Sequence, residues 1–295
     1  MGITSLHEHI QLPGDPRLRE KSMEFAISEL NKAKDLGLST IVEVSPTRDA
    51  AGIREISNAT GIQVICCTGS YVLSDEQQSM TVRDFENHMR REVEEGFDGT
   101  AIFPGVIKVA ARSTPLTTAE MNLFTAAAHI QQQYSLPICT HAVSGCADQQ
   151  RVLEKGGADL NHCYYSHVEA SMGWEGRSVE EEADYLESVI SHGSTLSFNN
   201  FGNWNHTRPD DLAYIIRELA GRGYEDHMVA TMDLTWSFEG ERLKILWEDT
   251  NENGDQRTYA YLLEQAVPWM KENGVPEQVV RKMIRDTPRR IFTYD

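Results

Sequence analysis

The chain lacks any long run of apolar residues. None approaches the ~20 consecutive residues that a membrane-spanning helix needs, so no membrane partner is expected. Basic residues are also few, because 27 Lys and Arg stand against 45 Asp and Glu, a formal net charge of −18. A nucleic-acid backbone or an anionic membrane surface is therefore not expected as a partner.

Cysteine is scarce as well, and no CxxC pair occurs. The five cysteines are Cys66, Cys67, Cys139, Cys146 and Cys163, and three of them stand in apolar, strand-like runs. We expect buried thiols at these positions. The odd count and the lack of a signal-peptide pattern predict a reducing, cytoplasmic compartment.

No GxGxxG motif opens a helix after the first predicted strand, which argues against an open, doubly wound sheet. Instead, apolar strand-like runs alternate with helical patterns, as in a parallel sheet with right-handed crossovers. The predicted strands are Ile3–Ile10, Thr40–Val44, Gln63–Thr68, Val106–Ala110, Pro137–His141, Cys163–His167, Thr195–Phe198 and Met228–Asp233. Eight such units predict an α/β fold, a single (β/α)8 TIM barrel domain over residues 1–295. Asn253–Asp255 marks the eighth loop, before final helices at Tyr259–Asn273 and Pro276–Phe292.

Chemically active residues stand at the ends of several predicted strands. In a barrel of this kind the active site lies at the C-terminal strand ends. His7 and His9 are two residues apart, and residues i and i+2 of a strand share a face, so both imidazoles can bind one metal. The other candidates at strand ends are Lys108 on the fourth strand, His141 on the fifth, His167 on the sixth and Asp233 on the eighth.

Each of these candidates also has a structural alternative. His141 alone fits a hydrogen-bonded core histidine, and Asp233 alone fits a helix N-cap. Lys108 is harder to explain in this way, because a fully buried ammonium without a partner is costly. One metal centre accounts for all of these placements together, whereas the structural alternative needs a separate reason for each. We therefore predict a single metal centre.

The candidate residues belong to a wider set of sequence segments. These are Gly2–Ile10, Val106–Ala110, Thr140-His141, Ser166-His167 and Met232-Asp233, with support from Gly221–Tyr224 and Asn273–Pro276. In this combination and order they resemble the phosphotriesterase family of the amidohydrolase superfamily, which includes phosphotriesterase-like lactonases. The resemblance extends over nearly the whole chain.

The resemblance implies a pair of divalent metal ions. His7, His9 and Asp233 would bind the more buried ion, and His141 and His167 would bind the more exposed one. Zinc is the expected metal, with manganese or cobalt as alternatives.

Lys108 would bridge both ions as an N6-carboxylated side chain formed with carbon dioxide. This modification would convert a buried cation into an anionic oxygen ligand. By the same resemblance, a hydroxide bridging two metals ~3.5–4 Å apart would attack the substrate. Asp233 would act as both metal ligand and general base, so Asp233 and Lys108 are the expected catalytic residues.

The loops after the strands bear on the substrate. Family lactonases tend to have an Asp-Arg-Tyr-like sequence after the seventh strand, where this chain has Asn199–Trp204, and the missing arginine disfavours acyl-homoserine lactones. Tyr71 is either a substrate contact or an ordinary aromatic at the rim. The expected substrate-binding residues are Tyr71, Asn200, Trp204 and Trp236. Together with His206, Arg208 and Arg242, they predict a polar small-molecule substrate.

These inferences predict a binuclear-metal hydrolase of a lactone or carboxylic ester, with phosphotriester turnover at most a side activity. The alternative is an amide or phosphate-ester hydrolase, because the same centre serves those bonds. A non-catalytic metal- or ligand-binding barrel is disfavoured by the intact ligand set. The resemblance allows a homodimer, although no stretch of the sequence shows an interface.

Overall fold

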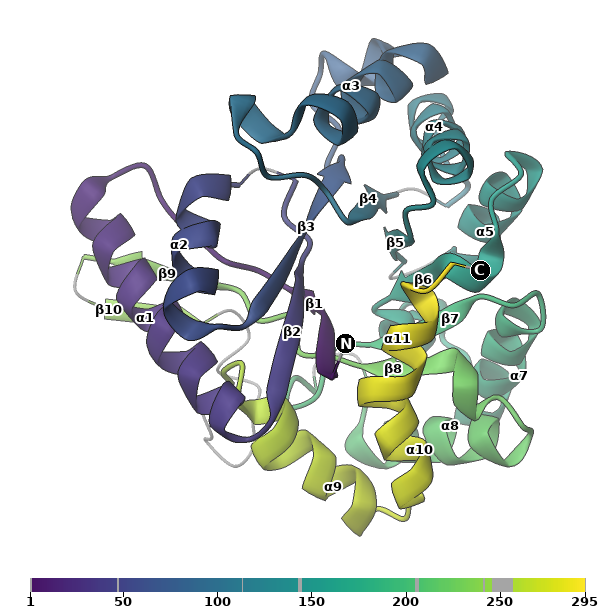
Figure 1. Ribbon diagram of the computed structural model, residues 1–295. Coiled ribbons are helices and arrows are strands. Elements are labelled where there is room, and N and C mark those ends of the chain that lie inside the picture. Colours follow the sequence, from purple (N-terminus) through teal and green to yellow (C-terminus); the bar gives the residue numbers. More distant parts are fainter. Residues whose placement is uncertain are drawn as a thin grey trace.

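The computed structural model describes residues 2–46, 48–112, 114–142, 145–204, 207–240, 242–245 and 257–294. Within these ranges, parallel strands follow one another around a nearly closed barrel with helices between them (Figure 1). The strands are β1 (Ile3–Glu8), β2 (Leu38–Glu43), β3 (Gln63–Gly69), β4 (Val106–Ala110), β5 (Ile138–His141), β6 (Cys163–Ser166), β7 (Thr195–Phe198) and β8 (Met228–Ala230). The predicted (β/α)8 TIM barrel is confirmed. The predicted eighth-loop marker Asn253–Asp255 and His206 lie outside the described residues.

Helices surround the barrel, and a separate hairpin follows β8. The helices are α1 (Pro16–Asp35), α2 (Ala50–Thr60), α3 (Val82–Glu95), α4 (Thr118–Tyr134), α5 (Cys146–Lys155), α6 (Ser171–Glu175), α7 (Val179–Ile190), α8 (Pro209–Gly221), α9 (Val267–Glu272), α10 (Glu277–Arg281) and α11 (Thr287–Ile291). π-Helical stretches at Leu262–Ala266 and Lys282–Asp286 lead into α9 and α11. The antiparallel hairpin of β9 (Trp236–Glu239) and β10 (Arg242–Ile245) was not expected from the sequence. Among the described residues, no helix is both long and apolar enough to cross a membrane.

Local sequence signals account for where several helices begin and end. The Asp15 carboxylate accepts the first free N–H groups of α1, and a proline opens that helix. Thr117 and Glu120 cap α4 reciprocally, each side chain accepting the other's backbone N–H. Gly61 ends α2 in the left-handed conformation, which glycine adopts without strain. These caps satisfy backbone groups that the helices themselves leave unpaired.

The barrel interior is packed with side chains and is not a channel. One apolar cluster joins side chains from seven of the eight strands, namely Leu6, Val42, Cys67, Val106, Cys139, Tyr164 and Val229. Ile291 of α11 belongs to the same cluster. All five cysteines are buried free thiols, as the sequence predicted. A filled interior leaves the barrel ends as the places for a site.

Helix α11 covers the N-terminal end of the barrel, beside the N-terminus of the chain (Figure 1). The Ile291 carbonyl lies 2.7 Å from the His162 Nδ1, just before β6. The guanidinium of Arg290 donates to the Thr195 Oγ1 at 2.7 Å, at the start of β7, and to the Asn161 carbonyl at 2.9 Å. With this end covered, the C-terminal strand ends are the open face.

Two of the strands that end earlier than the sequence pattern predicted bear directly on the site. β6 stops at Ser166 and β8 at Ala230, so His167 and Asp233 lie just beyond their strands. Both residues have left-handed backbone conformations, with φ of 64° and 51°. Non-glycine residues seldom adopt positive φ, and such outliers gather at functional sites. The turns redirect both side chains toward the barrel mouth.

Candidate active site

A pocket of about 960 Å³ opens at the C-terminal ends of the strands. Its lining includes all six candidate residues that were predicted at strand ends: His7, His9, Lys108, His141, His167 and Asp233. They come from β1, β4 and β5 and from the residues just after β1, β6 and β8. Residues more than 200 positions apart in the sequence therefore meet because parallel strands end at one rim.

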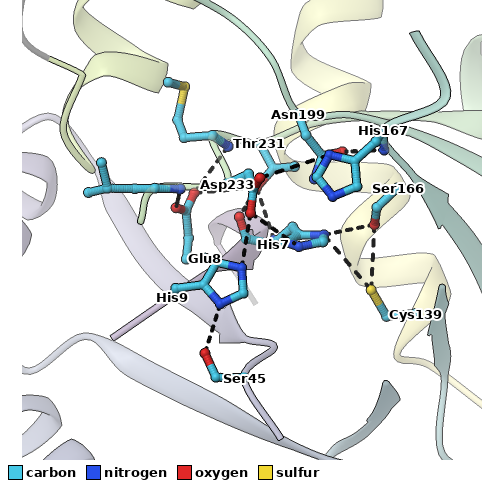
Figure 2. A network of polar contacts seen from close by, with 12 residues as sticks. His7, Glu8, His9, Ser45, Cys139, Ser166, His167, Asn199, Thr231 and Asp233 are labelled. Carbon is cyan, nitrogen blue, oxygen red and sulfur yellow. Dashed lines mark hydrogen bonds and ion pairs between the residues drawn. The ribbon is translucent and has the colours of Figure 1, made fainter. Parts of the chain in front are cut away.

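The carboxylate of Asp233 lies among three imidazoles (Figure 2). Its Oδ1 is 3.0 Å from the His9 Nε2 and 3.4 Å from the His7 Nε2. Its Oδ2 is 3.9 Å from the His167 Nδ1. One donor atom from each of His7, His167 and Asp233 forms a group in which all atoms lie within 4.8 Å of one another. Such a group is suited to holding one cation.

His141 stands on the other side of His167. The two ring centroids are 4.5 Å apart at 61°, and the ring centroid of Tyr71 lies 5.1 Å from that of His141. His141 and His167 thus form a second pair of imidazoles next to the first group. These two imidazoles are the side chains available to hold a second cation.

Hydroxyl groups orient the first two histidines. The His7 Nδ1 lies 2.8 Å from the Ser166 Oγ, and the His9 Nδ1 lies 2.7 Å from the Ser45 Oγ. Each ring therefore turns its Nε2 toward Asp233 (Figure 2). Metal-binding histidines generally have their second ring nitrogen held in this way.

Burial keeps most of these imidazoles neutral, which is the form that binds a metal. It lowers the pKa of His7 and His141 well below the usual value, and the pKa of His167 to about 4. Burial also acts on His9, but there the hydrogen bond and charge of Asp233 more than offset it and raise the pKa. For Asp233, burial is outweighed by neighbouring positive charge and by the bond from His9, so its pKa is lowered and it stays ionised.

Lys108 lies at the bottom of the pocket, in the middle of β4, and is only 1% exposed. Its Nζ is 3.5 Å from the Cys139 Sγ on the adjacent strand. Within the described part of the chain it forms no ion pair with a carboxylate. An unpaired ammonium in such a place is costly, so the position fits a modified or metal-bridging side chain better than a free cation.

Glu8 is a buried positioning residue that sequence reasoning missed. Its carboxylate accepts the N–H groups of Met232 at 3.1 Å and Leu234 at 3.0 Å, the two neighbours of Asp233 (Figure 2). It also accepts a bond from the Ser5 hydroxyl. Burial raises the pKa of Glu8 to about 7. The sequence signal was the acidic residue between two histidines, but Met232 and Leu234 are more than 220 positions away.

Further hydrogen bonds join the segments that follow β6, β7 and β8. The Asn199 Oδ1 accepts the His167 N–H at 3.2 Å, and the Glu169 carboxylate accepts the Asn199 N–H at 2.6 Å. Arg257 is 1% exposed and donates to the carbonyl of Phe201 at 3.0 Å and to that of Met232. These contacts were also not predicted, because the sequence pattern does not show which distant segments hydrogen-bond to one another.

The four predicted substrate contacts lie in different places. Tyr71, which is 43% exposed, and Asn200 line the pocket. Trp204 instead packs against Trp269, with ring centroids 5.5 Å apart, beside a smaller pocket of about 240 Å³. Trp236 is 2% exposed in the apolar core. The expectation for Trp204 and Trp236 is therefore corrected. Trp204 packs against Trp269 of α9, and Trp236 is buried in the core at the start of β9.

Comparisons with known proteins agree with the fold. The sequence profile of the phosphotriesterase family matches residues 1–292. The chain is 28% identical to the N-acetyltaurine hydrolase of Danio rerio, over 94% of this chain and 79% of that protein. It is 23% identical to the aryldialkylphosphatase of Saccharolobus solfataricus, over 99% and 95%. A crystal structure of a mutant phosphotriesterase-like lactonase from Deinococcus radiodurans superposes with a TM-score of 0.85 at 25% identity, over 99% of this chain and 96% of that chain.

Proposed function

The chain belongs to the phosphotriesterase family of hydrolases, and on that premise we propose that it is a binuclear-metal hydrolase of a lactone or carboxylic ester. The observation that carries the proposal is the convergence of four imidazoles, one ionised carboxylate and one buried lysine on the floor of a single pocket. The family generally uses a binuclear metal centre, and the donor set here suits it.

The residues present fit two divalent ions. His7, His9 and Asp233 would hold one ion, and His141 and His167 the other. We further propose that Lys108 would serve both ions as a carbamate, because a carbamate replaces the buried ammonium by an anionic oxygen ligand. Zinc is the proposed metal, because imidazole-rich sites suit it. When bound, such a pair activates water and polarises the carbonyl under attack.

The side chains of the chain itself position the reaction and move its proton. Asp233 is ionised. The Glu8 carboxylate accepts the N–H groups of both residues next to Asp233 and so holds its backbone in place; we call this pair of bonds the Glu8 clamp. It is the group on the pocket floor that can accept a proton from the attacking water. The His9 Nε2, 3.0 Å from Asp233, supports the carboxylate in its charged form. Tyr71 and Asn200 remain the proposed substrate contacts.

Amide hydrolysis is the second candidate. It is favoured by the similarity to N-acetyltaurine hydrolases, which are 27–28% identical to this chain. The segment Asn199–Trp204, which departs from the lactonase pattern, points in the same direction. The same metal centre and base would serve an amide carbonyl, although the amine is a poorer leaving group and needs a proton.

The test is a substrate panel on metal-loaded protein grown with bicarbonate and added zinc or manganese. It contains γ- and δ-lactones, aryl carboxylic esters, N-acyl amides and a dialkyl aryl phosphate, each assayed for wild type and Asp233→Asn. We expect the highest kcat/KM on a lactone or ester and a large loss in the variant. The highest kcat/KM on an amide would favour the second candidate. Metal-loaded protein that turns over none of the four classes would overturn the proposed function.

A further inference from the structure

We propose that Arg112 binds an anionic group of the substrate, such as a carboxylate, sulfonate or phosphate, at the wall of the active-site pocket. This inference rests on the proposed function and specifies that the substrate carries a negative charge. Arg112 follows β4 by two residues, lines the pocket and is exposed. It is four positions beyond Lys108, so its Cα lies at most ~14 Å from that of Lys108.

The carboxylates that line the pocket have other partners, so they do not pair with the Arg112 guanidinium. Glu92 is already engaged, because its carboxylate accepts from Arg48 at 3.0 Å and from the Thr68 hydroxyl at 2.6 Å. Asp233 is engaged by the histidines on the floor. Across the described residues, the Arg112 guanidinium has neither an ion pair nor a hydrogen bond with a side chain or carbonyl. A guanidinium in this position can bind a carboxylate, sulfonate or phosphate with two parallel hydrogen bonds.

The backbone of Arg112 is fixed although its side chain is free. Its N–H donates to the Glu120 Oε1 at 2.6 Å, and the other oxygen of Glu120 accepts the Thr117 N–H and hydroxyl, each at 2.8 Å. Glu120 is 6% exposed at the start of α4. A buried capping carboxylate thus ties the base of Arg112 to a helix, so a bound anion would order mainly the side chain. This arrangement reduces the entropic cost of binding.

Tyr71 and Arg112 line the same pocket as the histidines on its floor. The ring centroids of Tyr71 and His141 are 5.1 Å apart, in an edge-to-face arrangement. A substrate whose carbonyl lies over the histidines can therefore extend past Tyr71 and place a charged end at Arg112. In a protein of net charge −18, this local cation also reduces the repulsion of an anion.

The test compares two esters that differ in one charge. The probes are the mono-4-nitrophenyl ester of glutaric acid, which carries one carboxylate, and its neutral methyl 4-nitrophenyl diester. The readout is the ratio of their kcat/KM values for metal-loaded wild type, Arg112→Gln and Arg112→Lys. Arg54→Gln is the matched control, because it removes one exposed cation of α2 that does not line the pocket.

We expect Arg112→Gln to lower the ratio of charged to neutral ester by about 10- to 100-fold, mainly through KM, as for loss of a charged hydrogen bond. Arg112→Lys should keep part of the preference, and Arg54→Gln should keep all of it. High salt should shrink the difference, because the Debye length falls from ~10 Å at 0.1 M to ~3 Å at 1 M. A ratio that Arg112→Gln leaves within twofold of wild type, or that Arg54→Gln lowers equally, would overturn the proposal.

Binding of glutarate separates this proposal from the proposed reaction. Isothermal titration of metal-loaded protein with glutarate needs no turnover. If neither ester is cleaved, ester hydrolysis fails, yet a Kd that rises about tenfold or more in Arg112→Gln and not in Arg54→Gln would still support the anion site. An unchanged Kd would show that glutarate binds only at the centre on the floor and would refute the role of Arg112.

Discussion

The backbone N–H of Asp233 donates a hydrogen bond of 2.9 Å to the carbonyl of His7, and the His7 Nε2 lies 3.4 Å from the Asp233 Oδ1. These contacts join β1 to the segment after β8, where the first and last strands of the barrel lie next to each other. One main-chain bond therefore sets the separation of two proposed metal ligands from opposite ends of the chain. The left-handed conformation of Asp233, with φ of 51°, allows its main chain and side chain to serve both contacts.

Asp233→Asn should keep part of the bound metal and lose most of the turnover. An amide oxygen can still coordinate a cation, but it cannot accept the proton of the attacking water, and loss of a general base typically costs ~10²–10⁴-fold. Metal content by plasma emission spectroscopy and kcat are measured on the same preparation. Asp35→Asn, at the exposed end of α1, is the matched control. A kcat close to wild type in Asp233→Asn would remove the base from the mechanism.

Lys108→Met should lower the metal content sharply, from about two ions per chain in the proposed centre. The same change should leave the metal-free fold at least as stable as wild type, because it replaces a buried ammonium without a carboxylate partner by an apolar chain of similar length. Metal analysis and urea unfolding of both forms test the two parts. Full metal occupancy in the variant would mean that Lys108 does not bridge the ions.

Glu8→Gln should destabilise the metal-free protein and weaken metal binding together. The amide group brings N–H donors toward the backbone N–H groups of Met232 and Leu234, so at least one buried donor loses its acceptor, at a cost of ~1–3 kcal/mol. Urea unfolding and metal titration are compared with Glu24→Gln on the exposed face of α1. Equal effects from the two substitutions would show that the clamp on Asp233 has no special role.

Lowering the pH should destabilise the metal-free protein, because the pKa of His167 is low in the folded state. Its pKa is about 4 in the fold, and the ordinary value is 6.5. Between these values the unfolded chain binds a proton that the folded protein does not, so the free energy of unfolding falls as the pH is lowered from about 6.5 to about 4. The full contribution is roughly 3 kcal/mol.

His167→Asn should remove this part of the pH dependence. Its unfolding free energy should approach that of wild type, or exceed it, as the pH falls from 7 to 4. Glu8 and Glu169, whose pKa values burial raises to about 7, act in the opposite direction in both proteins and cancel in the comparison. Urea unfolding at pH 7, 5.5 and 4 gives the two curves, and parallel curves would contradict the assignment.

Residues at strand ends were predictable because they depend on a local pattern and one topological rule. The alternation of apolar runs with helices predicts a parallel barrel, and in a barrel every strand ends at the same rim. His7, Lys108, His141 and Asp233 could therefore be grouped without knowing any distance. Trp204 and Trp236 could not be placed, since the pattern does not say which way a loop side chain turns.

The fold class, the order of the strands and the set of polar side chains at the C-terminal rim could be predicted from periodicity and composition. How these side chains are held depends on the folded structure. The Glu8 clamp, the buried Arg257 and the positive φ of His167 and Asp233 depend on contacts between distant segments. The place of Arg112 in the pocket lining and the ion pair of Glu92 with Arg48 also depend on the folded structure. Hydrogen bonds and ion pairs across a barrel have no period in the sequence, so they appear only when the chain has folded.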